Sequence, residues 1–505
     1  MGNLDMAVGS ILLALISAGI YIFLISPAAK RRQLEVSGLR GPVPEFPLGN
    51  ISEMRKESRA PAPPTGQSMI THDIHSAVFP FFSRWRESYG KVFVYWMGTE
   101  SFLYVADPDF LSKMTAATTE NSWGKPNMFR QDRRPLFGEG MVMIEGESWA
   151  HRRHIITPAF STSNLKYMLD MVAESASTMI DEWSSLLASG RREIDMYDHL
   201  TRKTGEIIVN IVFGRNDGNG KEVLRRQIDL KYQLFHLKQT LASEAQGREM
   251  DRLLLSSIES RKAAMDSEEA GAFVPRGDLL GLLLTWNQMC ADHDSKKLTP
   301  IEIVGECKTF LFGGHETTSV ALSWTSLLLA QHPEWQTILR KEAEEVLADA
   351  PPDSSALAKL IKMRWVMNEA MRLYPSAIAQ RQARQDVRVG EVVIPKGTNI
   401  WVDILGMHHD PALWGSDANE FRPERFSDSL HGGCKHRMGF LPFGFGGRLC
   451  IGRNLAIFEY KILLSSILRR FSLALSPSYV HSPSMMLSLR PSHGVPLILT
   501  PLPVN

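Results

Sequence analysis

FGFGGRLCIG, from Phe443 to Gly452, places one cysteine among four glycines. Glycine lets backbone pass close beneath a flat group, and the residues that follow, RNLAIFEYKILLSSILRRF, predict a helix directly after the loop. A cysteine near a helix start has a lowered pKa, and Arg448 can offer a fixed fork of donors to a carboxylate. A lone buried cysteine in such a turn is more often a small apolar core residue than a metal ligand. Both interpretations remain open on this stretch alone.

A long helix is predicted upstream of this loop, from Thr299 to His332. Thr299-Pro300-Ile301-Glu302 forms a capping box with proline at the first helical position, and Pro333 ends the pattern. Gly313-Gly314-His315-Glu316-Thr317-Thr318 lies near the middle, where each glycine costs about 1 kcal/mol relative to alanine. A helix selected only for stability would not carry them. A hydroxyl beside them can bond to backbone and open a groove; the alternative is a kinked helix with a buried hydroxyl.

A carboxylate and a guanidinium group share one face of another predicted helix. Glu369 and Arg372 are three residues apart in WVMNEAMRLYP. An exposed pair would contribute little, but the apolar neighbours indicate burial, and a buried pair needs complete pairing. Arg425, in the segment FRPERF, offers the additional partner.

The amino-terminal residues have a different composition from the rest of the chain. No charge occurs between Asp5 and Lys30, and the stretch AVGSILLALISAGIYIFLIS is nearly all apolar. A helix of roughly twenty residues spans ~30 Å, the hydrocarbon thickness of a bilayer. Lys30-Arg31-Arg32 follows the apolar run, which favours a permanent anchor with the body in the cytosol. The alternative, a cleaved signal peptide, carries its positive charges in front.

Three segments are therefore expected along the chain. Residues 1–32 would be the transmembrane anchor with its basic stop, and residues 33–64 a linker that proline makes stiff. Residues 65–505 would form one catalytic domain, mainly α-helical with a minor β region. Two hairpins are predicted in it, KVFVYW with SFLYVA and DVRV with EVVI.

The overall composition excludes several classes of protein. The chain has 505 residues with 56 basic and 55 acidic side chains, and no long basic block, so we expect no nucleic-acid partner. Its 4 cysteines are too few for a disulfide framework, and none forms a CxxC pair typical of structural zinc sites. A globular protein with a sizeable core is the expected class.

The complete Phe-x-x-Gly-x-Arg-x-Cys-x-Gly spacing resembles the haem-ligand signature of the cytochrome P450 family. Gly447 stands where many relatives have proline. The order of the other motifs is similar as well: Trp149-Ala-His-Arg-Arg153, the long helix, E-x-x-R, PERF and then the cysteine loop. The resemblance covers essentially the whole chain, and GHETT and THDIHSAVFPFFSRW resemble the plant seventy-two clan. It implies a mainly α cytochrome P450-type fold with a minor β region, preceded by one transmembrane helix.

The resemblance also implies a role for each matching residue. Cys450 would be the thiolate ligand to the iron of haem b. Thr317 would hydrogen-bond dioxygen above the iron, and Glu316 would relay protons. Residues implied in cofactor binding are Trp149, Arg153, Arg381 (or its neighbour Arg384), Phe443, Gly446, Arg448 and Gly452. A structural triad bracing the haem-ligand loop would consist of Glu369, Arg372 and Arg425.

The implied activity is that of a haem-thiolate monooxygenase that hydroxylates an apolar small molecule with dioxygen. Electrons would come from NADPH through a separate NADPH-cytochrome P450 reductase, because no G-x-G-x-x-G lies between a strand and a helix. The expected location is the endoplasmic reticulum membrane, with one span and a cytosolic catalytic domain. Two alternatives remain: a haem-thiolate isomerase or dehydratase that needs no dioxygen, and a non-catalytic membrane-tethered binding protein.

The sequence says least about the identity of the substrate. Candidate apolar pocket residues are Phe310, Phe312, Ile378, Met485 and Met486, although methionine can equally fill gaps in a core. We expect a fatty acid or related apolar carboxylic acid, or else a hormone-like isoprenoid such as a cytokinin.

Overall fold

The computed structural model describes residues 2–58, 70–116, 122–215, 217–236, 241–266, 277–290, 297–347, 353–376 and 378–503. The chain divides into two compact units. The first consists of Met1–Pro126, Ile378–Asn419 and Cys434–Leu441, and the second of Asn127–Ala377, Glu420–Gly433 and Pro442–Asn505. The APAPP part of the linker and its predicted end at residue 64 lie outside the described residues.

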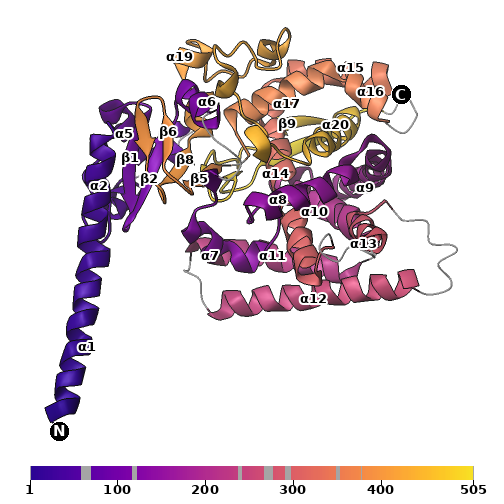
Figure 1. The fold of residues 1–505 in the computed structure, drawn as a ribbon. Coiled ribbons are helices and arrows are strands. Elements are labelled where there is room, and N and C mark those ends of the chain that lie inside the picture. The colour runs from indigo at the N-terminus through magenta and orange to yellow at the C-terminus, as the bar shows by residue number, and fades with distance from the viewer. Residues whose placement is uncertain are drawn as a thin grey trace. The chain divides into compact units, whose positions relative to one another are not determined.

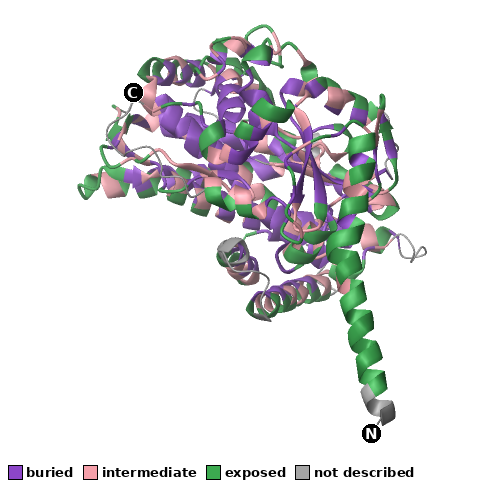
Figure 2. Cartoon of the chain, turned by 90° about the vertical axis from the view of Figure 1, so that its left-hand side faces the viewer, coloured by how far each residue is buried: buried purple, intermediate pink, exposed green. Residues whose placement is uncertain are grey.

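The first unit begins with a continuous helical segment (Figure 1). It comprises α1 (Gly2–Ile20), a π-helical turn η1 (Tyr21–Ile25) and α2 (Ser26–Val36), so helix continues four residues past the predicted end of the anchor at residue 32. Met6–Val36 is long and apolar enough to cross a membrane. The apolar side chains from Met6 to Ile25 are exposed, and Figure 2 shows this stretch in green, whereas Pro27 and Leu34 are buried.

The residues that follow the anchor run along the first strand. The Arg40 carbonyl accepts a hydrogen bond from the Val94 N–H at 2.9 Å, and the Asn50 N–H donates to the Trp96 carbonyl at 2.8 Å. Gly41 must be glycine here, because a Cβ at this position would meet the Val94 carbonyl. The described part of the predicted linker is thus bonded to the edge of a sheet.

That sheet has the strand order β1-β2-β8-β5-β3. The predicted KVFVYW–SFLYVA hairpin is confirmed as antiparallel β1 and β2, closed by a two-residue turn with Gly98 at φ +64°. β8 pairs with β2 in parallel, and the remaining pairs are antiparallel. The second predicted hairpin is confirmed as β6 and β7. The strands are β1 (Val92–Met97), β2 (Glu100–Val105), β3 (Trp123–Gly124), β5 (Ala379–Ala383), β6 (Val387–Val389), β7 (Val392–Ile394) and β8 (Asn399–Val402).

Short helices pack around this sheet. Buried polar contacts join two of these helices to the sheet: the Asp403 carboxylate accepts hydrogen bonds from Tyr104 at 2.5 Å and from the Gly406 N–H at 2.8 Å, and pairs with His75 at 2.6 Å. Burial alone would raise the pKa of Asp403, but His75 and these donors hold it below its ordinary value. The helices are α3 (Ile51–Ser58), α4 (His75–Val78), α5 (Pro80–Tyr89), α6 (Pro108–Ala116), α18 (Ile404–His408), α19 (Pro411–Trp414) and η7 (Arg437–Gly439).

The second unit is mainly helical, as predicted. Its small sheets are β4 (Glu193–Asp195), β12 (Pro496–Pro501) and β9 (Phe471–Leu475) in the order β4-β12-β9, and the pair β10 (Pro483–Met485) and β11 (Leu489–Pro491). Its helices are α7 (Asn127–Phe137), α8 (Gly146–Ile156), η3 (Thr157–Phe160), α9 (Thr162–Ala188), α10 (Met196–Phe213), α11 (Gly218–His236), α12 (Leu241–Asp266), α13 (Leu279–Met289), α14 (Pro300–Gln331), α15 (Pro333–Leu347), α16 (Ser354–Lys359), α17 (Ile361–Leu373), η6 (Pro423–Phe426), η8 (Gly446–Arg448) and α20 (Arg453–Arg470).

The long α14 lies at the centre of this unit (Figure 1). Its predicted start is confirmed: the Thr299 hydroxyl and the Glu302 side chain make reciprocal capping contacts, and Pro300 is the first helical residue. The predicted stop before Pro333 is also confirmed. Most of α14 is buried, and it packs against α10, α12, α17 and α20. A helix buried on nearly all sides can carry polar groups only where other elements pair them.

Candidate active site

The cysteine loop is shaped by its glycines and closed by its backbone. Gly444 and Gly446 have φ values of +79° and +63°, a conformation that side chains with a Cβ rarely adopt. The Cys450 N–H donates to the Phe443 carbonyl at 3.0 Å, which closes the loop before α20 begins. Phe443 and Cys450, at opposite ends of the predicted motif, are therefore joined directly.

The Cys450 side chain is exposed, and two guanidinium groups lie near it. Desolvation by the surrounding protein raises the pKa of Cys450, while the Gly452 N–H and the guanidinium groups of Arg153 and Arg453 act to lower it. Because a metal competes with the proton for sulfur, binding iron at this position would release the proton, and the nearby positive groups would stabilise the resulting thiolate.

Three further residues of the predicted haem site meet next to this loop. The Arg448 guanidinium carbon lies 4.3 Å from the centre of the Trp149 ring. Arg448 also donates to two carbonyl oxygens, Met141 at 3.3 Å and Ile144 at 2.9 Å. Arg153, one turn along α8 from Trp149, interacts electrostatically with Cys450. Stacking on an aromatic ring and two fixed acceptors hold the Arg448 fork in one orientation.

The donor set of this region fits haem. It combines one accessible thiol with two guanidinium groups, the ligand and the anion partners that a haem with two carboxylates requires. A Cβ added at Gly446 or Gly452 would meet no protein atom within 4 Å, so the loop presents bare backbone on that side. Cys450 would hold the iron, and Arg448 and Arg153 would pair with the carboxylates.

Glu369 and Arg372 form a fully buried bidentate pair on α17, with contacts of 2.7 and 2.8 Å. Arg425 of η6 completes the set, its Nε lying 3.5 Å from the Glu369 carboxylate. Backbone groups just before η6 add to it: the Arg422 N–H donates to Glu369 and Arg372 donates to the Glu420 carbonyl. The structure thus brings together the three residues predicted as a triad.

The two central glycines of α14 serve different purposes. A Cβ at Gly314 would collide with the Ile208 side chain of α10, so Gly314 permits the close packing of two helices. A Cβ at Gly313 would meet nothing within 4 Å. Thr317, half-buried, donates to the Gly313 carbonyl at 2.8 Å. Helix packing explains the glycine at position 314. It does not explain the glycine at position 313, which therefore remains the candidate for a functional surface.

Glu316 is buried in a cluster that sequence reasoning missed. Its carboxylate contacts the ammonium group of Lys231, from α11, at 2.7 Å and the Ser488 hydroxyl at 2.5 Å. The His315 ring lies 3.8 Å away. Burial acts to raise the pKa of Glu316, but Lys231 and His315 outweigh it and the net shift is downward, so the group is ionised at neutral pH.

One signal for Lys231 was present in the sequence. Val223, Leu224 and Leu230 mark the buried face of the amphipathic α11, and Gln227 and Lys231 occupy positions on that same face. A polar residue at a core position of a helix requires a buried partner. The sequence could therefore indicate that Lys231 is paired, but not with which carboxylate.

The predicted propionate contacts Arg381 and Arg384 belong to the first unit. Arg381 lies on β5 and donates to the Gln380 carbonyl at 2.8 Å, and burial lowers its pKa to about 10. Arg384 donates to the Lys125 carbonyl at 2.7 Å. Their contribution to haem binding stays a prediction.

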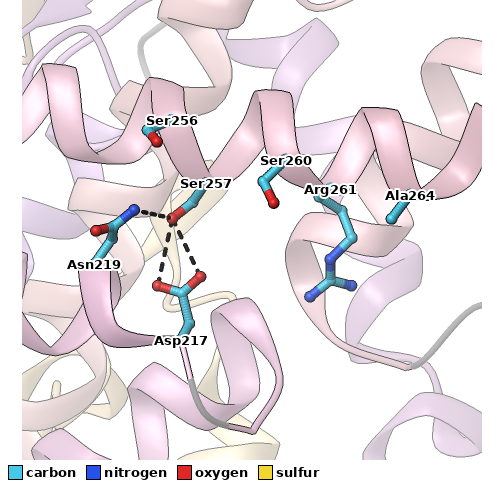
Figure 3. A pocket seen from close by; sticks show the side chains of 7 residues that line it. All are labelled: Asp217, Asn219, Ser256, Ser257, Ser260, Arg261 and Ala264. Carbon is cyan, nitrogen blue, oxygen red and sulfur yellow. Dashed lines mark hydrogen bonds between the residues drawn. The ribbon is translucent and has the colours of Figure 1, made fainter.

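A polar cavity lies beside α12, shown in Figure 3. Several of its polar groups are already paired: Asn219 donates to Ser257 at 3.1 Å and Ser257 donates to Asp217 at 3.1 Å, while Arg261 pairs at 3.0 Å with Asp278, outside the lining. None of the predicted apolar pocket residues lines it. Phe310 and Phe312 instead contact other aromatic rings. The ring centres of Phe310 and Phe160 are 5.6 Å apart, and those of Phe312 and Phe137 are 4.9 Å apart.

Comparison with known proteins identifies the family. The cytochrome P450 family model matches residues 61–497. Cytochrome P450 734A1 of Arabidopsis thaliana is 35% identical over 512 residues, which cover 97% of this chain and 95% of the relative. A cytokinin hydroxylase of the same plant is 35% identical over 513 residues, covering 98% and 97%. Cytochrome P450 714A2, also from Arabidopsis thaliana, is 32% identical over 506 residues, covering 96% of each.

The family match, together with the mainly helical fold and the cysteine loop before α20, defines a haem enzyme of the oxygenase class. The chain belongs to the cytochrome P450 family, whose cofactor is haem, and it is a cytochrome P450 monooxygenase.

Proposed function

We propose that this protein hydroxylates an apolar, hormone-like small molecule, with haem held by the Cys450 thiolate. The observation that carries the proposal is that Cys450 interacts with Arg153 and lies on the same loop as Arg448, which stacks on Trp149. When bound, haem supplies the redox chemistry that inserts one atom of dioxygen into a C–H bond and releases the other as water. The protein supplies the ligand, the anion contacts and the protons.

Thr317 and Glu316 are the proposed proton-handling residues. The Thr317 hydroxyl donates its one proton to the Gly313 carbonyl at 2.8 Å, so it can donate to another oxygen only when that contact opens. Both carboxylate oxygens of Glu316 are engaged, one by Lys231 and one by Ser488. Proton transfer through Glu316 therefore requires one of these two contacts to open.

Relatives narrow the proposed substrate. Two of the similar Arabidopsis thaliana proteins are cytokinin hydroxylases, 35% and 34% identical to this chain. This favours a hormone-like isoprenoid over a fatty acid among the two predicted classes. A spin-state titration of the purified protein with a panel of cytokinins, other isoprenoid hormones and fatty acids tests the choice. A shift with fatty acids alone would reverse it.

We further propose that the electrons come from NADPH through a separate reductase, and that the Met6–Val36 helix anchors the protein in the endoplasmic reticulum with its catalytic units in the cytosol. The basic residues after the apolar run support this orientation. Protease treatment of intact microsomes should digest the catalytic units; their protection would place them in the lumen.

The thiolate assignment has a direct spectroscopic test. The ferrous carbon-monoxide complex of the full-length protein should show the red-shifted Soret band of a thiolate ligand, and Cys450→Ser should lose that band. An unshifted band in the folded wild-type protein would exclude thiolate ligation. Product formation that proceeds without dioxygen or reductase would favour the isomerase alternative.

Replacing the Thr317 hydroxyl tests the proton-handling role. In Thr317→Ala, NADPH oxidation should continue while product falls about a hundredfold and hydrogen peroxide rises, because general acid–base groups contribute about 100-fold or more. Thr317→Ser, which keeps a hydroxyl, should restore most of the product. Unchanged coupling in Thr317→Ala would contradict the role.

A further inference from the structure

The segment from Glu139 to Ile144 lies flush against α14. Gly140 and Gly305 make the approach possible: a Cβ at Gly140 would collide with the Gly305 carbonyl, and a Cβ at Gly305 would lie 2.6 Å from the Gly140 nitrogen. Two glycines facing one another at a helix surface fix the distance between two backbones. The segment can therefore pack this closely against α14 only where Gly140 faces Gly305.

Glu306, the residue after Gly305, connects this segment to the cysteine loop. Its carboxylate accepts the Met141 N–H at 3.0 Å. The carbonyl of the same residue, Met141, accepts from Arg448 at 3.3 Å, and the Ile144 carbonyl accepts from Arg448 at 2.9 Å. A continuous chain of hydrogen bonds thus leads from the Glu306 carboxylate through residue 141 to the Arg448 guanidinium group.

Arg152 holds the other side of the Glu306 carboxylate. Its Nη1 lies 3.1 Å from Glu306, and its Nη2 lies 2.8 Å from Glu302, one turn earlier on α14. Arg152 also donates to the Glu139 carbonyl, so one guanidinium group ties both α14 and the segment to α8. Glu306 is fully buried and Arg152 is 5% exposed, so this pair is shielded from screening by salt.

Opposing effects set the pKa of the buried Glu306 carboxyl group. Burial raises its pKa to about 7, the Met141 N–H and Arg152 act in the opposite direction, and Glu302 adds to the rise. These are the charged and polar groups that face it from α8, α14 and the segment. An ionised carboxylate accepts hydrogen bonds more strongly than a protonated one.

We propose that Glu306 is a positioning residue for the haem carboxylates: through Met141 it holds the two carbonyl oxygens that orient Arg448, while Arg152 keeps the Glu306 carboxylate in place. This inference rests on the proposed haem site around Cys450. It assigns a cofactor-related task to a residue far from the cysteine in sequence.

The test is the rate at which haem leaves the purified full-length holoprotein for an excess of a haem-scavenging apoglobin. Glu306→Ala should release haem about tenfold faster, because a hydrogen bond to a charged group is lost. Glu306→Gln keeps an acceptor for the Met141 N–H, so it should release haem only about threefold faster than wild type. Glu302→Gln is the matched control: it alters the other carboxylate of Arg152 without touching Met141, and should stay within about twofold of wild type.

A double-mutant cycle separates positioning from general structure. On an Arg448→Lys background, Glu306→Gln should change the release rate by less than about twofold, since residues acting through one contact are not additive. Between pH 8 and pH 6 the wild-type rate should rise more than that of Glu306→Gln, because only the wild type protonates here. Equal rates in wild type and Glu306→Gln at pH 8, or additive effects in the cycle, would overturn the inference. A wild-type protein that binds no haem would instead refute the proposed function.

Discussion

The same short pattern gives the same geometry on a buried helix face and on an exposed helix face of the second unit. In α17, Arg372 contacts Glu369 at 2.7 and 2.8 Å; in α11, Arg225 contacts Glu222 at 2.8 and 2.7 Å. Both are E-x-x-R. The Glu369 pair is fully buried, whereas the side chains of Arg225 and Glu222 are 60% and 34% exposed.

The surroundings account for the difference. Every residue from Val366 to Leu373 is buried, so the Glu369 pair has protein on all sides and receives backbone partners from residues 420 and 422. The further contacts of Arg225 come from Asp229, on the same helix and in water. A local spacing sets the contact distances, but only distant parts of the chain decide what the contact is worth.

Removing the buried carboxylate should have the largest effect. Glu369→Ala leaves Arg372 and Arg425 buried without their carboxylate, which should cost about 5 kcal/mol of unfolding free energy and give protein that retains no haem. Urea unfolding and haem content measure both. Glu222→Ala, with the same spacing and bond lengths, is the matched control. Normal haem content in Glu369→Ala would contradict the bracing role.

Breaking a second buried pair, Lys231 with Glu316, should cause the next largest loss of stability, and this loss should depend on pH. In wild type the pKa of Glu316 lies below its ordinary value of 4.5, so its contribution is present above that pH and is lost as pH falls. In Lys231→Met, burial should dominate and raise the pKa of Glu316, so stability should fall as pH rises. The variant should therefore lose about 3 kcal/mol at pH 7 and less at pH 5.

Lys461→Met provides the comparison for that variant. Lys461 is as buried as Lys231, but it donates to the Leu357 carbonyl at 2.7 Å, and burial lowers its pKa to about 8. Both the folded and unfolded forms therefore carry the charge below pH 7. Its loss of stability should be constant between pH 5 and pH 7 in the same urea experiments, and a parallel slope in both variants would exclude the assignment to Glu316.

The exposed pair should give the smallest effect. Arg225→Ala should leave the urea midpoint and the haem content unchanged within error, although Arg225 and Arg226 together lower the pKa of Glu222 to about 2. Solvent and salt screen this contact, so the shift does not translate into stability. A loss comparable to that of Glu369→Ala would show that the geometry of the pair matters more than its burial.

The comparison also explains what the sequence could predict. The capping box at Thr299, the two hairpins and the cysteine loop depend on residues close together in the chain, and each lies where expected. The E-x-x-R spacing alone was not sufficient, because it occurs at Glu222, Glu249 and Glu369. Burial had to be inferred from the apolar neighbours of Glu369.

The contacts that were missed connect distant residues. Glu316 pairs with Lys231 across 85 positions and with Ser488 across 172, and Arg152 pairs with Glu306 across 154. No local pattern specifies such partners, since they result from how helices pack. The glycines of α14 show a related limit: their cost to the helix was evident, but that Gly314 serves packing against Ile208 required the structure.

The bonding of residues 40–50 along β1 has a practical consequence for producing a soluble form. These residues cover an edge strand, and an uncovered edge invites pairing between molecules. Leu34, only 1% exposed, extends the covered region back into α2. A truncation that removes only residues 1–25 should therefore stay monodisperse in detergent-free buffer, whereas deletion of the first 50 residues should aggregate.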